Sequence, residues 1–256
     1  MIKFYRIIRQ NILMENKTGK YIKYAFGEIV LVVIGILIAV QINGYYKKQA
    51  EMQINIQLLN RMISEIDLNI ERLDFLEYNT NLDSLRTKVF SENEKELKWS
   101  LTILENGVKT QDIDSLVLVD FNRSSYNLHR SIYDKMINTG KLYNLGSDSL
   151  IGEINEYYKL IEREDYYNKK QIIRTNDLYF QCKYGWVNLV NDYRLKSGVN
   201  LADYPWLSDK TSKEYVNLRT YWSKAHAVIK RSRERMDGIR MRSYKLKEHI
   251  QLAIND

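Results

Sequence analysis

Glu28 has the most unusual position of any ionisable residue in this sequence of 256 residues, because it borders a long apolar stretch. Residues 24–46 read YAFGEIVLVVIGILIAVQINGYY, and residues 29–40 include no polar side chain. A carboxylate inside a membrane is costly and often functional. A second interpretation places Glu28 beside the lipid headgroups, with a hydrogen bond from Tyr24 one helical turn earlier. Proton transfer is the least favoured role.

In a helix, Glu28 shares one face with two small residues. Gly35 and Ala39 are four positions apart, and small residues at this spacing let transmembrane helices approach closely. The sequence therefore predicts a helix-association face in the membrane, which comprises Glu28, Leu31, Gly35, Ala39 and Ile42. Its expected partner is a second copy of the chain or another membrane protein.

A basic cluster near the C-terminus is the second candidate site. Residues 224–248 contain nine Lys or Arg and three acidic residues. One interpretation is a solvated helix face. The other is contact with anionic lipid headgroups or with an acidic partner. The residues predicted to make that contact are Arg240, Arg242, Lys245 and Lys247.

The other reactive side chains form no catalytic or metal-binding pattern. The three histidines, which lack the HExxH spacing of a zinc site, are His129, His226 and His249. Ser124–Ser125 lacks the G-x-S-x-G context of a nucleophile. Cys182, the only cysteine, excludes an intramolecular disulfide and falls on an apolar seam, where it is expected to be buried. We expect no enzyme activity, no metal and no cofactor.

The charge distribution narrows the class of partner. The net charge is +7, but residues 1–24 contain six basic residues and one acid, and residues 43–256 contain 33 basic and 30 acidic residues. This near-neutral domain argues against bulk nucleic-acid binding, which needs a large cationic face. The pairs Tyr157–Tyr158 and Tyr166–Tyr167 could line a ligand cleft, although ring packing is favoured. We expect a lipid bilayer as a partner, no nucleic acid and no small-molecule ligand.

The apolar stretch predicts a single transmembrane helix over residues 21–46. Between Tyr24 and Tyr45 a helix rises about 32 Å, and the hydrocarbon core is about 30 Å thick. Six basic residues precede the span and three follow it, so residues 1–20 are predicted to be a basic interfacial segment in the cytoplasm. Cleavage as a signal peptide is disfavoured because residues 37–41 lack an A-x-A pattern.

The first helix is predicted to continue beyond the membrane as a stalk over residues 47–80. Mostly apolar residues recur at alternating steps of four and three from Leu31, inside the span, to Leu73 in the stalk. Residues 81–256 are predicted to form a helical bundle packed on the stalk. The fold class is therefore all-α: a transmembrane helix continuous with a long stalk helix, then an extramembrane bundle with antiparallel long helices.

The last helix of the bundle is predicted from a second heptad seam. Its positions are Tyr215, Leu218, Trp222, Ala225, Ile229, Ser232, Met236, Ile239, Ser243, Leu246 and Ile250. The predicted helix starts are a capping box at Ser91 and Glu94, another at Thr211 and Glu214, and N-caps at Ser125 and Ser147. Gly107 and Gly140 are predicted to end helices.

Three stretches are less regular. Residues 108–120 are ambiguous, because Leu116–Val119 fits either a strand or a buried helical turn. A long helix is predicted to follow Ser147 and to end before Gly198, with a bend near residues 167–170. Residues 198–210, which include the only proline, Pro205, are predicted to be a loop.

Two parts of the chain resemble a known family. MIKFYRIIRQNILMENKTGKYIKYA and GEIVLVVIGILIAVQIN resemble the start of a family of uncharacterised Gram-negative bacterial membrane proteins, catalogued as a domain of unknown function. Residues 131–162, from SIYDKMINTGKL to SDSLIGEINEYYKLIE, resemble its second signature. The family usually has Asn-Asn-Trp-Asn after the span, where this chain has Asn43–Gly44–Tyr45–Tyr46. The resemblance implies a single-pass protein with a helical extramembrane portion, and no known activity.

These features favour a non-enzymatic, membrane-tethered interaction or scaffold module of the bacterial inner membrane, with a periplasmic C-terminal domain. The alternative is a periplasmic ligand-sensing helical bundle that acts through a partner protein. A pocket lined by polar groups would favour the sensor, and an apolar stripe left exposed on the folded chain would favour the scaffold.

Overall fold

The computed structural model describes residues 18–78, 89–145, 147–196 and 198–255. In these ranges the regular secondary structure is helical and includes no strand, which confirms the predicted all-α class. The chain divides into two compact units, residues 1–57 and 58–256. Most of the predicted interfacial segment, and the predicted end of the stalk at residues 79–80, lie outside the described residues.

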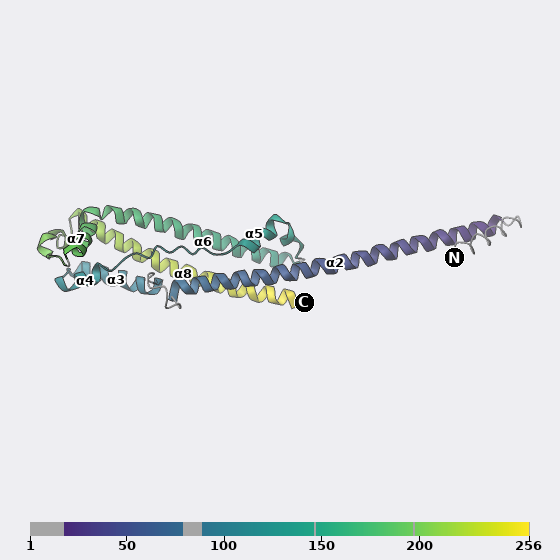
Figure 1. Cartoon of the computed structure of the whole chain (residues 1–256), viewed down its shortest axis with the longest axis horizontal. Coiled ribbons are helices and arrows are strands. Elements are labelled where there is room, and N and C mark those ends of the chain that lie inside the picture. The colour runs from purple at the N-terminus through teal and green to yellow at the C-terminus, as the bar shows by residue number, and fades with distance from the viewer. Residues whose placement is uncertain (1–17, 79–88, 146, 197, 256) are drawn as a thin grey trace. The chain divides into compact units, whose positions relative to one another are not determined.

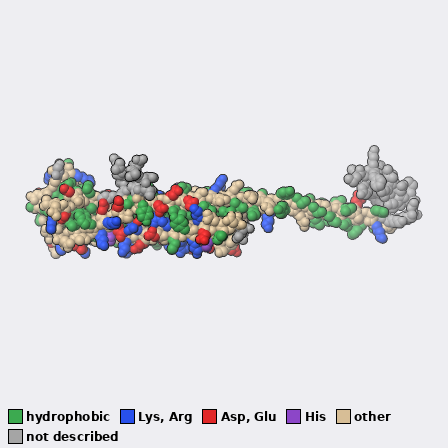
Figure 2. All heavy atoms as spheres, turned by 90° about the horizontal axis from the view of Figure 1, so that it is seen from below, with side chains coloured by type: hydrophobic (Ala, Val, Ile, Leu, Met, Phe, Trp, Pro, Cys, Tyr) green, Lys and Arg blue, Asp and Glu red, His purple; other side chains and the backbone are tan. Residues whose placement is uncertain are grey.

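In the first unit, the described residues belong to helix α2, Thr18–Tyr78. Every side chain from Ile29 to Val40 is exposed, and this part of the surface is largely hydrophobic (Figure 2). A helix that is apolar on all sides matches a membrane span better than a surface helix in water. Helix α2 is long and apolar enough to cross a membrane.

The second unit is a bundle organised around helix α8, Lys213–Asn255. It packs against helix α3, Phe90–Asn106, and helix α6, Asp148–Gln181, which lie alongside it (Figure 1). The C-terminal part of α2, from Leu58 onward, completes the bundle and contributes seven large hydrophobic residues to its core: Leu58, Leu59, Met62, Ile66, Ile70, Leu73 and Leu76.

Ion pairs establish the direction in which α8 runs. Lys247 pairs with Asp67 at 2.7 Å, and Arg240, one heptad earlier, pairs with Asp74 at 2.7 Å. Residue numbers therefore rise on α8 as they fall on α2, so the two helices are antiparallel. Nearer the start of α8, Arg233 pairs with Glu94 and Arg219 with Glu105, so α8 is antiparallel to α3 as well. The predicted antiparallel pairing of the two long helices is confirmed.

Helix α8 presents one continuous seam to the core. All eleven positions that the heptad pattern predicts there are buried, and Tyr221 and Val228 are buried beside them. Trp186 and Trp222 meet edge to face with centroids 5.0 Å apart. Burying one large apolar side chain contributes about 1.5–3 kcal/mol, so this seam is a major source of stability.

The ambiguous residues 108–120 form helical turns and not a strand. A 3-10 turn at Thr110–Asp112 leads into the short helix α4, Ile113–Leu116. Leu116 and Val117 are buried, at 0% and 7% exposure. Of the two interpretations of Leu116–Val119, the buried helical turn is therefore the one that the structure adopts.

The prediction that Ser125 caps a helix is wrong. Helix α5 spans Ser131–Asn138, six residues later, and residues 119–130 have an extended backbone without regular secondary structure. Tertiary hydrogen bonds hold this segment extended, and they override its local helical pattern. Gly140 follows α5 with φ at +67°, a left-handed conformation that glycine adopts without steric cost. A 3-10 turn at Lys141–Asn144 comes next.

Of three further predicted helix starts, the one at Ser147 is confirmed and those at Ser91 and Thr211 are wrong. Ser147 is confirmed as the N-cap of α6, because its hydroxyl accepts from the Leu150 backbone N–H at 3.3 Å. The Ser91 box is wrong: α3 begins one residue earlier, and the Ser91 hydroxyl donates to the Glu77 carbonyl. The Thr211 box is also wrong, because Ser212 accepts from the Tyr215 N–H and α8 begins after it.

Helix α6 continues without a break through residues 167–170, where a bend was predicted. The regular helix ends at Gln181, a π-helical turn occupies Lys183–Val187, and α7 follows at Asn188–Lys196. A Cβ on Gly185 would lie 2.9 Å from the Glu214 Cβ, so only glycine permits this close approach to α8. The predicted loop after Gly198 holds two 3-10 turns, Leu201–Asp203 and Pro205–Leu207.

Candidate functional site

The predicted helix-association face lies on the exposed part of α2. Glu28, Leu31, Gly35, Ala39 and Ile42 are all exposed, and their spacing places them on one side of the helix. A Cβ built on Gly35 meets no other atom within 4 Å. The face is therefore open along its length, and Gly35 forms a shallow point where a second helix could approach.

The predicted basic contact surface divides into two pairs of residues. Arg240 donates to the Asp74 carboxylate and to the Leu73 carbonyl, and its side chain is 11% exposed. Lys247 donates to Asp67 at 2.7 Å. These two cations face α2, and they pair with its partly exposed acids Asp67 and Asp74. Arg242 and Lys245 are exposed, and they are the residues of the predicted surface that remain accessible.

A further group of ion pairs joins α8 to α2 and to α3. Arg233 pairs with Glu77 of α2 at 2.6 Å and with Glu94 of α3 at 2.5 Å. Glu77 is only 2% exposed, and hydrogen bonds to both carboxylates raise the pKa of the Arg233 guanidinium. Since Arg233, Arg240 and Lys247 are spaced by seven residues, they form a charged row beside the apolar seam of α8.

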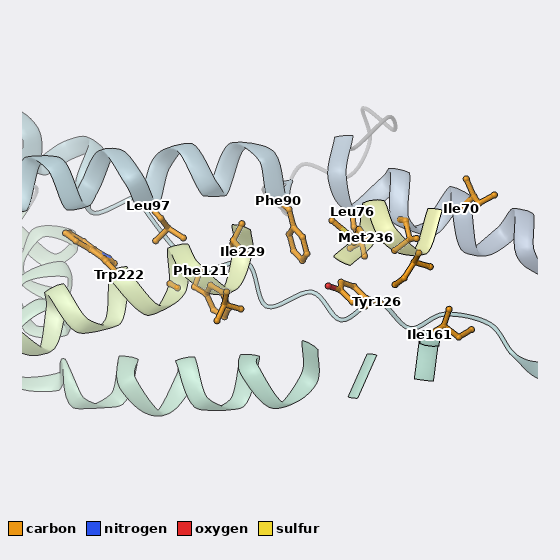
Figure 3. Packing of buried hydrophobic residues seen from close by; sticks show 14 of the residues in the cluster. Ile70, Leu76, Phe90, Leu97, Phe121, Tyr126, Ile161, Trp222, Ile229 and Met236 are labelled. Carbon is orange, nitrogen blue, oxygen red and sulfur yellow. The ribbon is translucent and has the colours of Figure 1, made fainter. Parts of the chain in front are cut away.

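Sequence reasoning missed the extended segment 119–130, which passes among the helices. Phe121 and Tyr126 project from it into the core (Figure 3). Asn69 of α2 donates to the His129 carbonyl at 2.9 Å and accepts from the His129 N–H at 2.6 Å. Arg72 donates to the carbonyls of Ser125 and Tyr126, each at 3.0 Å. Side chains satisfy the backbone here because the segment has no neighbouring strand.

Glu65 is the buried carboxylate at the start of α5. It is 3% exposed and accepts three hydrogen bonds, from the Tyr158 hydroxyl at 2.7 Å, the Ser131 hydroxyl at 2.8 Å and the Ile132 N–H at 2.8 Å. A carboxylate at a helix N-terminus satisfies otherwise unpaired N–H groups and interacts favourably with the helix dipole. Glu65 thereby joins α2, α5 and α6 at one point.

Of the tyrosines that could line a cleft, Tyr157 and Tyr158 belong to this buried centre. Tyr158 is fully buried and stacks on Tyr133 with ring centroids 4.2 Å apart. Burial, together with the Glu65 carboxylate, raises the pKa of the Tyr158 hydroxyl far above its ordinary value. The Tyr157 hydroxyl lies 3.0 Å from the Ser243 hydroxyl of α8. The rings of Tyr157 and Tyr158 are therefore packed in the core, as the favoured interpretation predicted. Tyr166 and Tyr167 are exposed.

The remaining nucleophiles and metal-ligand candidates are separated. Cys182 is 1% exposed, and burial raises the pKa of its thiol to about 12, so thiolate formation is suppressed. His249 contacts Glu153 across the α6–α8 interface. Among the described residues, no three His, Cys, Asp or Glu side chains are grouped in a way that could hold a metal ion.

One exposed apolar row appears on the outer side of α6. Tyr166, Ile173 and Phe180 are 58%, 62% and 73% exposed, and each follows the last by seven residues. The sequence pattern contained this signal, but a heptad on a bundle helix is ordinarily assigned to the core. The contacts of α6 with α8 and with the 119–130 segment reveal that this row points outward.

No protein-family model, curated protein or solved structure matches this chain. The resemblance to uncharacterised Gram-negative membrane proteins therefore stays a prediction.

Proposed function

We propose that this protein is a membrane-tethered, non-enzymatic helical interaction module of the bacterial inner membrane. The observation that carries the proposal is the change of character along α2. Residues Ile29–Val40 are exposed and wholly apolar, whereas Leu58–Leu76 present a buried seam to a bundle. A helix with both characters is suited to hold a folded domain at a bilayer, because its first part is stable in lipid and its second part in a protein core.

The proposed orientation follows from the charges that flank the span. The excess of Lys and Arg before it supports a cytoplasmic N-terminus and a periplasmic bundle. A cysteine at Leu195, which is 83% exposed, would report this orientation. In intact cells with a permeabilised outer membrane, a membrane-impermeant maleimide should label the Leu195→Cys variant. Native Cys182 is buried and serves as the unreactive background. Labelling that requires lysis of the inner membrane would refute the topology.

Interaction, and not ligand sensing, is the proposed role because two helix faces present regularly spaced, exposed apolar side chains on the folded chain. These are the α2 face that includes Gly35 and the outer row of α6 that includes Ile173. Exposed apolar patches on folded proteins mark contact sites. In the membrane, the small pair Gly35 and Ala39 supports close packing with a second helix.

Substitution of the small residues tests the association face. Gly35→Leu and Ala39→Leu in the full chain, extracted in mild detergent, should weaken oligomer formation about tenfold or more, because larger side chains separate the helices. The monomer tolerates the change, since nothing lies near Gly35. Val33→Leu, on the opposite side of the helix, is the matched control and should have no effect. Oligomers of equal stability in all three variants would contradict the proposed face.

A further inference from the structure

The last turns of α8 carry a row of exposed side chains on the side that faces away from the bundle. Steps of four, three and four place the row on one side of the helix, opposite buried core positions such as Leu246 and Ile250. We call it the α8 outer row, and its residues are Met241, Lys245, Glu248 and Leu252. Met241 and Leu252 are 69% and 58% exposed, and Tyr244, which is 56% exposed, lies beside them. The spacing is that of a helix–helix seam.

The α8 outer row has apolar ends and a charged centre. Whereas Arg240 and Lys247 pair with acids of α2, Lys245 and Glu248 are exposed on the outer side of α8. These two charges are three positions apart, so their levels differ by about 4.5 Å along the helix axis. Because this step is short, each charge can reach the opposite charge of an equal helix that lies alongside in parallel. The row is therefore complementary to itself.

The proposed membrane tether decides how two copies can meet. Helix α2 is continuous from Thr18 to Tyr78, and α8 is antiparallel to it. Copies that are held in one membrane therefore have parallel α8 helices. A two-fold axis along the membrane normal then brings equal residues together at equal levels. A self-contact on this bundle must accordingly allow each of its residues to meet its own counterpart.

We infer that the α8 outer row binds the α8 outer row of a second copy of this chain, in parallel orientation. The two Met241 side chains meet at one end of the contact and the two Leu252 side chains at the other, so an apolar layer closes each end. Between these layers, Lys245 of each copy pairs with Glu248 of the other, and two ion pairs cross the axis. The acidic partner predicted for Lys245 is therefore a residue of the same chain in its second copy.

Charge spacing favours this row over the exposed row of α6 as the self-contact. Parallel α6 helices set Lys170 against Lys170 and Asp177 against Asp177, and the seven positions between the two kinds of charge span about 10.5 Å. That separation exceeds the Debye length of about 8 Å at physiological ionic strength, so the opposite charges compensate little. An anionic membrane surface also fits the α8 outer row less well than a second copy does, because it repels Glu248.

This inference rests on the proposed membrane-tethered function, because the tether sets the parallel orientation, but it concerns the bundle and not the membrane face. Cysteine cross-linking of the full chain in membranes tests it, with buried native Cys182 as the unreactive background. Met241→Cys and Leu252→Cys should each form a disulfide-linked dimer. Each variant should link with itself at least about tenfold faster than differently tagged Met241→Cys and Leu252→Cys chains link with each other. Leu195→Cys, at a residue of α7 that is 83% exposed, is the collision control.

A charge swap provides a second readout in the Met241→Cys variant. Lys245→Glu and Glu248→Lys should each slow cross-linking at least about tenfold, because each leaves four like charges at the contact. The variant that combines both changes exchanges the two charges and should restore the original rate. Both positions are exposed, so the fold of the bundle tolerates these substitutions.

Four outcomes overturn the inference. A mixed disulfide that forms as fast as the self-linked dimers indicates an antiparallel contact, and linkage of the row cysteines to a different protein indicates another partner. Row cysteines that react no faster than Leu195→Cys indicate random collision, and a rate that Lys245→Glu leaves unchanged refutes the ion pairs. If these signals fail while Gly35→Leu still disrupts oligomers, only the α8 contact is refuted. The converse result refutes the membrane face and supports the α8 contact.

Discussion

Replacing Glu65 by alanine tests whether one buried carboxylate holds three parts of the bundle together. In the folded chain it accepts hydrogen bonds from the buried Tyr158 hydroxyl, the Ile132 N–H and the Ser131 hydroxyl. Tyr158 is fully buried, so its hydroxyl loses its acceptor and gains no water. Ser131 is exposed, and water can replace its lost partner.

The expected magnitude follows from these three environments. Loss of a hydrogen bond from a buried hydroxyl to a charged acceptor costs about 1.5–3 kcal/mol. Loss of the capping contact to the Ile132 N–H costs about 1 kcal/mol. Ser131 contributes little, so Glu65→Ala should lower the free energy of unfolding by about 3 kcal/mol. Burial of the remaining apolar seam keeps the bundle folded.

A double-mutant cycle separates the hydrogen bond from general loss of packing. Tyr158→Phe alone should cost about 1.5–3 kcal/mol, because Glu65 loses a charge-assisted bond. In the Glu65→Ala background the same change should be nearly neutral, since no acceptor remains. Urea unfolding of the full chain in mild detergent, followed by the fluorescence of its four tryptophans, of which Trp186 and Trp222 are buried, measures both values. Tyr143→Phe, at a 64% exposed tyrosine, is the control and should be neutral. A coupling energy below about 0.5 kcal/mol would refute the reasoning.

Three further predictions concern the α8 contacts and the core. Arg240→Met should destabilise the bundle by about 1–3 kcal/mol, since it leaves Asp74 and the Leu73 carbonyl without a donor; a change within about 0.5 kcal/mol in urea unfolding would contradict this. Burial raises the pKa of Tyr126 to about 12, so above pH 10 the unfolded chain loses this proton first. Tyr126 should therefore account for about 1.4 kcal/mol per pH unit of the fall in stability between pH 10 and 12, and Tyr126→Phe should reduce the slope by about that amount. Gly185→Ala should cost about 1–3 kcal/mol because its methyl group meets Glu214, and the thermal midpoint should recover in the double variant with Glu214→Gly.

Local spacing was enough to predict the long helices and the side that each of the first and last helices buries. The seam from Tyr215 to Ile250 is buried at every predicted position, and the α2 seam is buried from Leu59 onward except for the half-buried Ile63. These features depend on residues three or four positions apart, whose relative directions are set by helix geometry. Ser147 and Gly140 were predictable for the same reason, since a cap acts on its own helix.

Caps at Ser91 and Ser125 failed because distant groups compete for the same atoms, whereas at Thr211 the neighbour Asp209 accepts from the hydroxyl and Ser212 supplies the cap. Ser91 bonds to the Glu77 carbonyl, and the backbone near Ser125 bonds to Arg72, 53 residues away. Such competition is invisible to a pattern that compares only neighbouring positions. The extended segment 119–130 was missed for this reason, since its conformation depends on side chains of other helices.

The candidate surfaces also differ in whether the sequence alone could predict them. Periodicity and charge in the sequence were sufficient to identify the apolar α2 face with Gly35 and Ala39, because that face depends on one helix alone. Four basic residues of the last helix looked equivalent in sequence, yet Arg240 and Lys247 meet acids of α2, and Arg242 and Lys245 stay exposed. The outward direction of Ile173 was likewise decided by tertiary packing. A heptad states which side chains share a face, but only the neighbouring helices determine whether that face is core or surface.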